Sequence, residues 1–599
     1  MKYTAIVVGA GHAGIEASLA IARAGFETLL LTMRVDAIGQ MSCNPAIGGL
    51  AKGHMVREID ALGGEMGVAT DATGIQFRML NRSKGPAVWG PRAQADKKAY
   101  RLYMIEKIKS QKNLDLIEGQ ATGLLVENGK AIGVRTAQGE EFFGGHVIVT
   151  TGTFMQGLIH IGDVNYPGGR RDEAPSVGLS DSLRKLGFEV VRFKTGTPPR
   201  LDAATIHWDA LEPQLGDDPP EPFSFRTGKL EVQQLSCYLT YTNKKTHEII
   251  KKNLHLSPLY AGRIEGIGPR YCPSIEDKVV KFHDKERHQI YLEPEGRDTV
   301  ETYVNGLSMS LPPKVQEEIV HSMQGLEDVK IIRWAYAIEY DALPPTQLKH
   351  SLETKRIENL FLAGQVNCTS GYEEAAAQGL IAGLNVIRKL EGEAPFILDR
   401  SEAYIGVLID DLVTRGTNEP YRMFTSRAEF RLLLRQENAD ERLMKYGYEF
   451  GLIPKEIYER SLEKYTRVNS EIERLRNTRT PGGTTLDQWL KRPENSYRKL
   501  LDEGFGNGPL TEEEIRHIEF NVKYEGYIQR EGSEAKRFRY LEKRVIPKEI
   551  DYSGIHGLRR EAKEKFSKIK PSSIGQASRI PGITPCDLSL LAVFLEANQ

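Results

Sequence analysis

The sequence predicts an α/β body that is interrupted by a β-rich insertion and followed by a mainly helical C-terminal third. Three observations predict this fold class. Strand-like runs lead through glycine turns into alanine-rich helices at the start and end of the first 400 residues, and another enters a glycine turn midway. Strand-like runs without such helices lie between residues 200 and 300. After residue 400, apolar residues recur at helical spacing among charges, as in 458–477 and 557–569.

Length and composition exclude several classes of protein. The 599 residues exceed what one hydrophobic core holds, so we expect about three to four domains. Charged residues make up 27% and hydrophobic residues 40% of the chain, which excludes wholesale disorder. The five scattered cysteines contain no CxxC pair, so we predict no disulfide scaffold, no metal site and a reduced, cytoplasmic protein. No apolar run approaches the ~18 residues that span a bilayer, and the net charge of −1 indicates no particular partner.

The predicted domain boundaries follow these changes in composition. The dinucleotide-binding body comprises residues 1–200 and 301–400, and the inserted domain comprises residues 201–300. A proline-rich exit and an acidic proline-rich loop (212–222) mark the beginning of the insertion. Residues 401–599 form the predicted helical domain.

The first glycine turn has the spacing of a dinucleotide site. A short β-branched strand is followed by Gly9-Ala10-Gly11-His12-Ala13-Gly14 and an alanine-rich helix. In such a GxGxxG turn Gly9 permits the tight turn, Gly11 lets the backbone approach a pyrophosphate, and Gly14 lets the helix pack on the strand. The second strand (29–34) lacks the acidic residue that usually binds the ribose, so the ribose hydroxyl needs another partner.

Two later segments indicate which dinucleotide is resident. Residues 146–154 are an apolar strand that runs into a Thr-Gly turn, and residues 359–386 are again a strand, a glycine turn and an Ala/Gly helix. In two-dinucleotide flavoproteins, the second dinucleotide-contacting turn resembles residues 146–154, and the closing flavin segment resembles residues 359–386. The three segments together predict a Rossmann-like two-dinucleotide body with FAD as its resident cofactor and NADH as a visiting reductant.

Two cysteines lie in glycine- and proline-containing loops. A disulfide reductase would have a second cysteine a few residues after Cys43, and this sequence has none there. Cys272 follows Arg270 and precedes Lys278 and Lys281, and neighbouring cations favour the nucleophilic thiolate. The alternative for both residues is an inert, packed thiol.

A row of arginines indicates a nucleic-acid partner. Arg427, Arg431 and Arg435 recur in steps of four, which predicts one face of a helix that can meet a phosphate backbone. A solvated or salt-bridged face is the alternative. Residues 530–570 add 13 Lys/Arg against 7 Asp/Glu, a local positive charge that the total conceals.

Seven segments together resemble one family, the bacterial tRNA uridine 5-carboxymethylaminomethyl modification enzymes (MnmG, also called glucose-inhibited division protein A). They are residues 9–14, 42–54, 168–180, 193–201, 268–282, 363–379 and 419–440. The resemblance implies an FAD enzyme that works as a homodimer with the partner GTPase MnmE, in a heterotetramer. It implies that the two proteins build an aminomethyl or carboxymethylaminomethyl group on C5 of the wobble uridine of certain tRNAs. Methylene-tetrahydrofolate would supply the carbon, and NADH the reducing equivalents.

The resemblance also assigns residues. It implies that FAD is bound by residues 9–14, Thr122, Ser176 and Gln365, and that Cys43 and Cys272 are the two functional cysteines. The helical domain would contact tRNA and the partner. The NAD-associated segment would comprise Gly268, Pro269, Arg270, Tyr271, Cys272, Pro273, Ser274, Ile275, Glu276, Asp277, Lys278, Val279, Val280, Lys281 and Phe282.

The expected chemistry fits a thiol, since uracil C5 is a poor nucleophile until C6 is attacked or the ring is otherwise activated. A thiolate that adds to C6 makes C5 enolate-like and leaves by elimination. Cys272 is the first choice for this role because of its basic neighbours, and Cys43 is the alternative or a general acid/base. Three other functions stay open: a folate- and FAD-dependent tRNA uridine methyltransferase, a flavin disulfide reductase, and a flavin-holding scaffold that recruits a GTPase to tRNA. The long helical extension argues against the methyltransferase.

Overall fold

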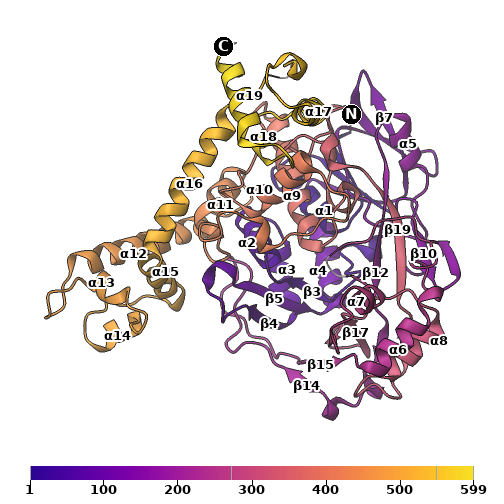
Figure 1. Ribbon diagram of the computed structural model, residues 1–599, viewed down its shortest axis with the longest axis horizontal. Coiled ribbons are helices and arrows are strands. Elements are labelled where there is room, and N and C mark those ends of the chain that lie inside the picture. The colour runs from indigo at the N-terminus through magenta and orange to yellow at the C-terminus, as the bar shows by residue number, and fades with distance from the viewer. Residues whose placement is uncertain (1, 271–272, 548, 598–599) are drawn as a thin grey trace.

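The computed structural model describes residues 2–270, 273–547 and 549–597, which form an α/β body, two further sheets and two helical units (Figure 1). Separate groups of buried apolar side chains support this division. One core fills the body, one lies under the inserted sheet, and one lies in each helical unit.

The body is organised around a seven-stranded sheet whose strands are rich in buried aliphatic residues, as expected of a sheet that is covered on both faces. The order is β6-β2-β1-β9-β8-β7, and β20 also pairs with β9. The pairs among β6, β2, β1, β9 and β20 are parallel, whereas β7, β8 and the start of β9 form an antiparallel meander. The strands are β1 (Tyr3–Val8), β2 (Thr28–Thr32), β6 (Leu114–Glu118), β7 (Ala121–Glu127), β8 (Lys130–Thr136), β9 (Glu141–Val149) and β20 (Leu360–Leu362).

The helices of the body follow the glycine turns that the sequence marks. α1 (His12–Arg23) and α9 (Tyr372–Leu390) pack so closely that a Cβ on Gly379 would lie 2.0 Å from the Ala13 carbonyl oxygen. The predicted Rossmann-like body is therefore confirmed. A three-stranded antiparallel sheet and four helices complete it: β3 (Ala46–Gly48), β5 (Gly90–Ala95), β4 (Gly74–Leu80), α2 (Lys52–Ala61), α3 (Met66–Thr73), α4 (Lys97–Ser110) and α5 (Leu179–Lys185).

Two more sheets are formed by the part of the chain between β9 and β20. A four-stranded sheet has the order β11-β10-β19-β12, with β10 (Leu158–Ile161), β11 (Val164–Pro167), β12 (Val191–Thr197) and β19 (Tyr336–Ala342). An antiparallel six-stranded sheet has the order β14-β15-β16-β17-β13-β18, with β13 (Arg200–Asp202), β14 (Glu212–Gln214), β15 (Cys237–Tyr241), β16 (Gln289–Pro294), β17 (Glu301–Asn305) and β18 (Ile331–Arg333). The boundary predicted at residue 300 falls between β16 and β17, which are hydrogen-bonded neighbours in this sheet. The accompanying helices are α6 (Lys244–Lys252), α7 (Ile275–Lys281) and α8 (Pro313–His321).

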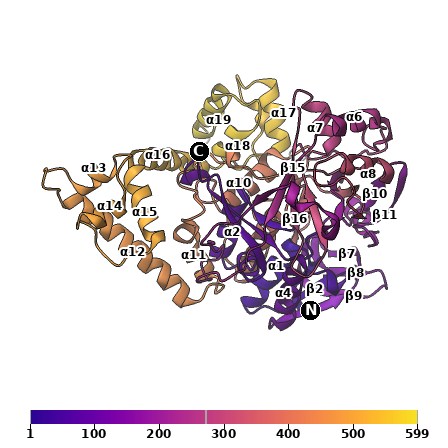
Figure 2. The same ribbon diagram turned by 90° about the horizontal axis from the view of Figure 1, so that it is seen from below.

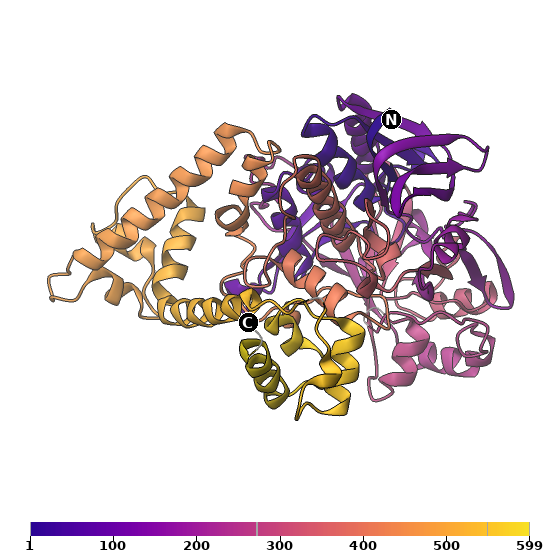
Figure 3. The ribbon, with the colours of Figure 1, turned by 90° about the horizontal axis from the view of Figure 1, so that it is seen from above.

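The last third of the chain is helical, as predicted. α10 (Tyr404–Asp410) and α11 (Ala439–Glu449) pack on the body, and an arm built from α12 (Lys455–Asn477), α13 (Leu486–Leu490), α14 (Tyr497–Asp502) and α15 (Glu512–Lys523) projects away from it (Figures 2 and 3). The long α16 (Glu525–Lys543) leads back to a terminal bundle of α17 (Arg560–Ile569), α18 (Ile574–Arg579) and α19 (Pro585–Ala597). None of the helices in the described part of the chain combines the length and the apolar character needed to cross a membrane.

Candidate functional site

The first glycine turn is closely packed on one side and open on the other. Gly9 has a φ of +100°, and a Cβ there would lie 2.7 Å from the Thr150 carbonyl oxygen. A Cβ on Gly14 would lie 1.8 Å from the Gly9 carbonyl oxygen, so α1 packs directly on the turn. A Cβ on Gly11, in contrast, would meet no atom within 4 Å. Gly11 therefore borders the side from which a pyrophosphate can approach the N-terminus of α1.

The second and third glycine turns meet the first one. Thr150, directly after β9, donates from Oγ1 to the carbonyl oxygens of Val8 (2.8 Å) and Gly9 (3.0 Å). A Cβ on Gly152, in the second turn, would lie 3.9 Å from Oε1 of Gln365 in the third turn. The three segments that the sequence marks thus converge at the carboxyl ends of parallel strands, where α/β sheets bind ligands.

Buried polar atoms without a partner lie at this convergence. Among the described residues, Nε2 of His12 and Oγ1 of Thr151 are buried and make no hydrogen bond. The His12 ring stacks on Tyr372 at a centroid distance of 4.6 Å, which fixes it between α1 and α9. Burial lowers the pKa of His12 to about 4, so the imidazole is neutral near pH 7. An open Gly11, a free helix N-terminus and two unpartnered polar atoms fit an adenine dinucleotide such as FAD.

The segment that carries Ser176 lies against the second turn and contacts Thr122 at Gly178. A Cβ on Gly178 would lie 3.1 Å from the Thr122 carbonyl oxygen, so β7 contacts the segment that carries Ser176. Ser176 is buried, and its amide donates to the Phe154 carbonyl at 2.7 Å. The two segments that carry these predicted residues are therefore neighbours, although they are far apart in sequence.

Cys43 lies where the body meets the inserted sheet. Its loop follows β2, and its amide donates to the Tyr372 hydroxyl at 2.7 Å, at the start of α9. The sulfur lies 3.3 Å from the hydroxyl of Tyr303, on β17. Arg200, on β13, donates to the Cys43 carbonyl at 2.9 Å. Elements separated by more than 300 residues thus meet around one thiol, beside the turn that precedes α9.

Sequence reasoning missed the three residues that surround this thiol. Arg200 and Tyr372 lie inside segments that carry the family resemblance, and those segments were a usable signal. Tyr303 lies in an ordinary strand, where an aromatic residue indicates only β structure. Its contact with Cys43 depends on how the inserted sheet docks, which no local pattern reports.

The segment 268–282 is anchored just before its start and again after Cys272. Tyr271 and Cys272 lie outside the described residues, so the predicted Cys272 thiol has no position here. Before them, Oε1 of Glu339 accepts the amides of Glu265 (2.9 Å) and Gly266 (2.6 Å). After them, Ser274 caps α7 by accepting the Asp277 amide, and the Ile275 amide donates to the Ser308 carbonyl at 2.7 Å.

The segment 419–423 links this loop to the start of α9. The Arg270 amide donates to Oε2 of Glu419 at 2.9 Å, and the Met423 amide donates to Oε1 of Glu374 at 3.0 Å. Lys52, on α2, pairs with Glu374 (3.0 Å) and with Glu373 (2.9 Å). Although burial opposes ionisation of Glu373, the Lys52 ammonium holds the pKa of that carboxyl below its usual value. Arg270, the loop of Cys43 and the arginine-containing segment are therefore all connected to the start of α9.

The predicted helical face of arginines is wrong. Thr425–Arg427 forms a short 3₁₀ turn, and residues 428–438 are turns and loop that precede α11. The amides of Leu432 and Leu433 donate to Glu531 of α16 rather than to carbonyls of their own helix. Tertiary contacts therefore override the helical spacing of these side chains.

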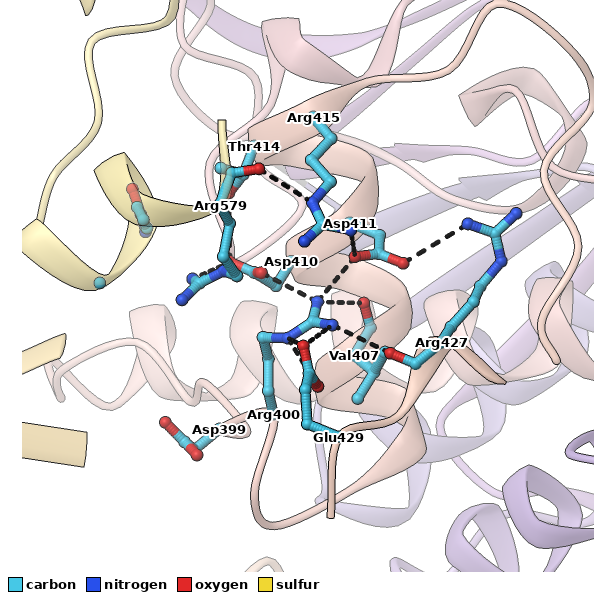
Figure 4. Close-up of polar contacts among 12 residues, drawn as sticks. Asp399, Arg400, Val407, Asp410, Asp411, Thr414, Arg415, Arg427, Glu429 and Arg579 are labelled. Carbon is cyan, nitrogen blue, oxygen red and sulfur yellow. Dashed lines mark hydrogen bonds and ion pairs between the residues drawn. The ribbon is translucent and has the colours of Figure 1, made fainter. Parts of the chain in front are cut away.

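The three arginines have different environments. Arg435 is buried, pairs with Glu437 at 2.9 Å and lies over the Phe520 ring, so it presents no surface to a phosphate. Arg427 and Arg431 line a polar pocket of about 660 Å³ together with Arg415. Asp411 lies 3.7 Å from Arg427 and 3.5 Å from Arg415, in a buried network that also holds Arg400 (Figure 4).

Known proteins match the whole length of the chain. Residues 4–394 match the family described as Glucose inhibited division protein A. Residues 455–532 match the tRNA modifying enzyme MnmG/GidA C-terminal helical domain, and residues 534–599 match the C-terminal helical bundle of the same enzyme.

Individual relatives agree with this match. The "tRNA uridine 5-carboxymethylaminomethyl modification enzyme MnmG" of Geobacter sulfurreducens is 56% identical, over 100% of this chain and 98% of its own. The protein of the same name from Caldicellulosiruptor saccharolyticus is 52% identical over 99% and 98%. The solved structure of Aquifex aeolicus GidA superposes with a TM-score of 0.94 at 51% identity, over 99% of this chain and 100% of that one. The chain is a member of the MnmG/GidA family.

Proposed function

We propose that this protein is an FAD-dependent enzyme that modifies C5 of uridine in tRNA; the names of its full-length relatives describe those proteins as tRNA uridine 5-carboxymethylaminomethyl modification enzymes. The observation that carries the proposal is the position of Cys43. It lies against the start of α9, whose preceding turn completes the dinucleotide site, and against the inserted sheet. A thiol beside a predicted flavin site can act as an acid, a base or a nucleophile in pyrimidine chemistry with a redox cofactor.

The finer assignment is the wobble uridine and an aminomethyl or carboxymethylaminomethyl group. FAD, when bound, supplies the redox chemistry by which NADH and methylene-tetrahydrofolate deliver a reduced one-carbon unit. The protein contributes a thiolate, which forms a bond to uracil C6 and makes C5 nucleophilic. After C5 has gained its new bond to carbon, loss of the C5 proton expels the thiolate and restores the ring.

Cys272 remains the first choice for the thiolate that attacks C6. Described residues on both sides of it are anchored: the amides of Gly266, Arg270 and Ile275 donate to Glu339, Glu419 and Ser308. Cys43 then serves as an acid or base near the flavin. NADH is expected to bind at the segment 268–282 that carries Cys272.

Partners follow from the same family membership. We propose that tRNA contacts the pocket lined by Arg415, Arg427 and Arg431 and the helical units beyond it. A homodimer and a heterotetramer with the GTPase MnmE complete the proposed assembly.

Nucleoside analysis tests the function directly. A bacterial strain that lacks its own copy of this enzyme is complemented with the wild-type chain or with Cys272→Ala. Its tRNA is then digested, and the nucleosides from the wobble position are analysed by mass spectrometry. The proposal expects carboxymethylaminomethyl or aminomethyl derivatives with the wild-type chain and none with Cys272→Ala, although both purified proteins show a flavin absorption band. Normal modification by the variant would refute the role of Cys272. A wild-type chain that yields only 5-methyluridine would instead favour the methyltransferase.

A further inference from the structure

The terminal bundle contacts α10 of the body through Arg579, the last residue of α18. Nη2 of Arg579 donates to Oδ1 of Asp410, at the end of α10, at 2.7 Å, and its Nη1 pairs with Glu542 of α16. The side chains of Arg579 and Asp410 are only 7% and 6% exposed, so this ion pair is held away from water. His350 also contacts Asp410, at 3.1 Å, and Gln576 of α18 lies 3.2 Å from the same imidazole. The contact between α18 and α10 is therefore a buried junction with polar groups from both sides.

Arg400 joins this junction to the arginine pocket, which is lined by Arg415, Arg427 and Arg431. Its Nη1 donates both to Asp410, at 3.0 Å, and to the neighbouring Asp411, at 2.7 Å. Its Nη2 donates to the carbonyl oxygen of Arg427 at 3.2 Å (Figure 4). Because the side chain of Arg400 is 2% exposed, water is not at hand to replace any of these partners. A continuous chain of direct contacts thus leads from Arg579 through Asp410 and Arg400 to the backbone of the pocket.

A π-helical turn provides a second connection. α10 continues directly into Asp411–Arg415, a π turn, and such turns are rare in proteins and frequent at functional sites. Arg415, at the end of the turn, donates from Nε to the carbonyl oxygen of Arg579 at 3.2 Å and lies 3.5 Å from Asp411. Asp411 also lies 3.7 Å from Arg427. Two arginines of the pocket therefore share one buried carboxylate with the residues that receive the terminal bundle.

Loss of the Arg579 guanidinium would redistribute these ion pairs. Among the described residues, Arg400 would then be the guanidinium that still contacts Asp410. A buried carboxylate is costly to leave uncompensated, so Arg400 would be drawn toward Asp410 and away from Asp411 and the pocket wall. Asp411 would complete its pairing with the two pocket arginines, whose guanidinium groups lie 3.5 and 3.7 Å away. Guanidinium groups that pair with a buried carboxylate are less available to a phosphate.

We propose that Arg579 is a positioning residue for RNA binding: by pairing with Asp410 it leaves Arg400 to Asp411, and so keeps the arginine pocket available to a phosphate of bound tRNA. This inference rests on the proposed function, in which tRNA contacts that pocket. It adds that RNA binding and docking of the terminal bundle on α10 are coupled. Because such coupling is reciprocal, bound tRNA also holds the bundle more firmly in place.

The first test measures the affinity of the full-length holoprotein for an unmodified tRNA transcript by filter binding. Arg579→Gln removes the cation from Asp410 and is expected to weaken binding about tenfold. Arg579→Lys keeps a cation there and should restore most of the affinity. Arg559→Gln is the matched control, because it removes one positive charge from the same bundle but pairs with Asp587 inside that bundle, at 2.5 Å, so affinity should change by less than about twofold. Equal affinities of Arg579→Gln and wild type overturn the proposal.

A second set of variants separates positioning from direct contact between the bundle and RNA. In a chain that already carries Arg415→Gln and Arg427→Gln, Arg579→Gln should weaken binding by less than about twofold further, because the arginines through which it acts are gone. Low salt keeps the remaining binding measurable. A further loss of about tenfold in this background overturns the proposal, since the bundle would then act on tRNA independently of the pocket.

The reciprocal effect gives a test that does not require Arg579→Gln to fold. Amide hydrogen exchange of α18 is followed by mass spectrometry, with and without saturating tRNA, in the wild type and in the Arg415→Gln/Arg427→Gln chain. Bound tRNA should slow exchange in the wild type and not in the double variant. No slowing in the wild type, or equal slowing in both, overturns the proposal. The proposed function fails separately if the wild-type chain leaves tRNA unmodified while affinities and exchange behave as described, an outcome that supports the coupling.

Discussion

Arg400 and Asp411 form a buried ion pair in which Nη1 of the arginine donates to Oδ1 of the aspartate at 2.7 Å, with side chains only 2% and 3% exposed (Figure 4). The neighbouring Asp410 accepts from the same Nη1 at 3.0 Å and from Arg579 of the terminal bundle at 2.7 Å. Because Asp411 also faces Arg427, one buried network joins the terminal bundle to the arginine pocket.

Removal of the shared guanidinium should destabilise this junction strongly. Arg400→Met leaves two buried carboxylates short of a partner, and we expect the unfolding free energy to fall by about 3–5 kcal/mol. Thermal unfolding followed by circular dichroism measures the change. Arg560→Met is the matched control, since Arg560 and Glu564 form an exposed pair, and it should change stability by less than about 0.5 kcal/mol. Equal effects of the two variants on stability would contradict a stabilising role for the buried pairs of Arg400 with Asp410 and Asp411.

Two glycines of the first turn should respond differently to substitution. Gly11→Val places its side chain in open space, so the flavin-free protein keeps its thermal midpoint while FAD affinity falls by at least about tenfold, or ~1.4 kcal/mol. Gly14→Val drives a side chain into the Gly9 carbonyl and should destabilise the protein itself. Flavin content by absorbance and thermal unfolding without added FAD separate the two effects. Tight FAD binding by Gly11→Val would place the pyrophosphate elsewhere.

Charge reversal in the arginine pocket should weaken tRNA binding in a salt-dependent way. Arg431 is exposed at the pocket, so Arg431→Glu is expected to reduce affinity and to lower the slope of log affinity against log salt by about one. Filter binding at several salt concentrations measures both. Arg135→Glu, in an exposed pair that joins β8 to β9, is the control that should leave the slope unchanged. The same slope for wild type and Arg431→Glu would remove Arg431 from the interface.

Glu16 should make stability depend on pH. It is buried on α1, and burial raises its pKa from 4.5 to about 7, although it accepts the amides of Glu65 and Met66. Because the folded pKa is raised, the native state favours the protonated acid, and this contribution to stability is lost as pH rises from about 4.5 to 7. Glu16→Gln should remove that loss, with a difference on the order of 3 kcal/mol between pH 4 and pH 8. Thermal midpoints at the two pH values provide the measurement. The exposed Glu27→Gln is the control, and a Glu16→Gln curve parallel to wild type would contradict the prediction.

Local patterns were sufficient for the body of the fold. Gly9, Gly11 and Gly14 stand between an aliphatic strand and an alanine-rich helix, and the backbone freedom of glycine makes such a turn readable from neighbours alone. The same reasoning located the turns after β9 and β20. It failed for Arg427 to Arg435, where helical spacing was present but Glu531 of a distant helix takes the backbone amides.

The sequence by itself determined the three strand–glycine turn segments, the helical C-terminal third and the cysteines that a pyrimidine reaction would need, since each is encoded by residues within about 20 positions of one another. Only the tertiary structure decided that Tyr303 and Arg200 of the inserted sheet meet Cys43, that Arg435 is buried, and that Arg400 is shared between Asp410 and Asp411. The physical reason is that these contacts depend on how separate sheets and helices dock, and burial, rather than any local spacing, selects which charged and polar groups must pair.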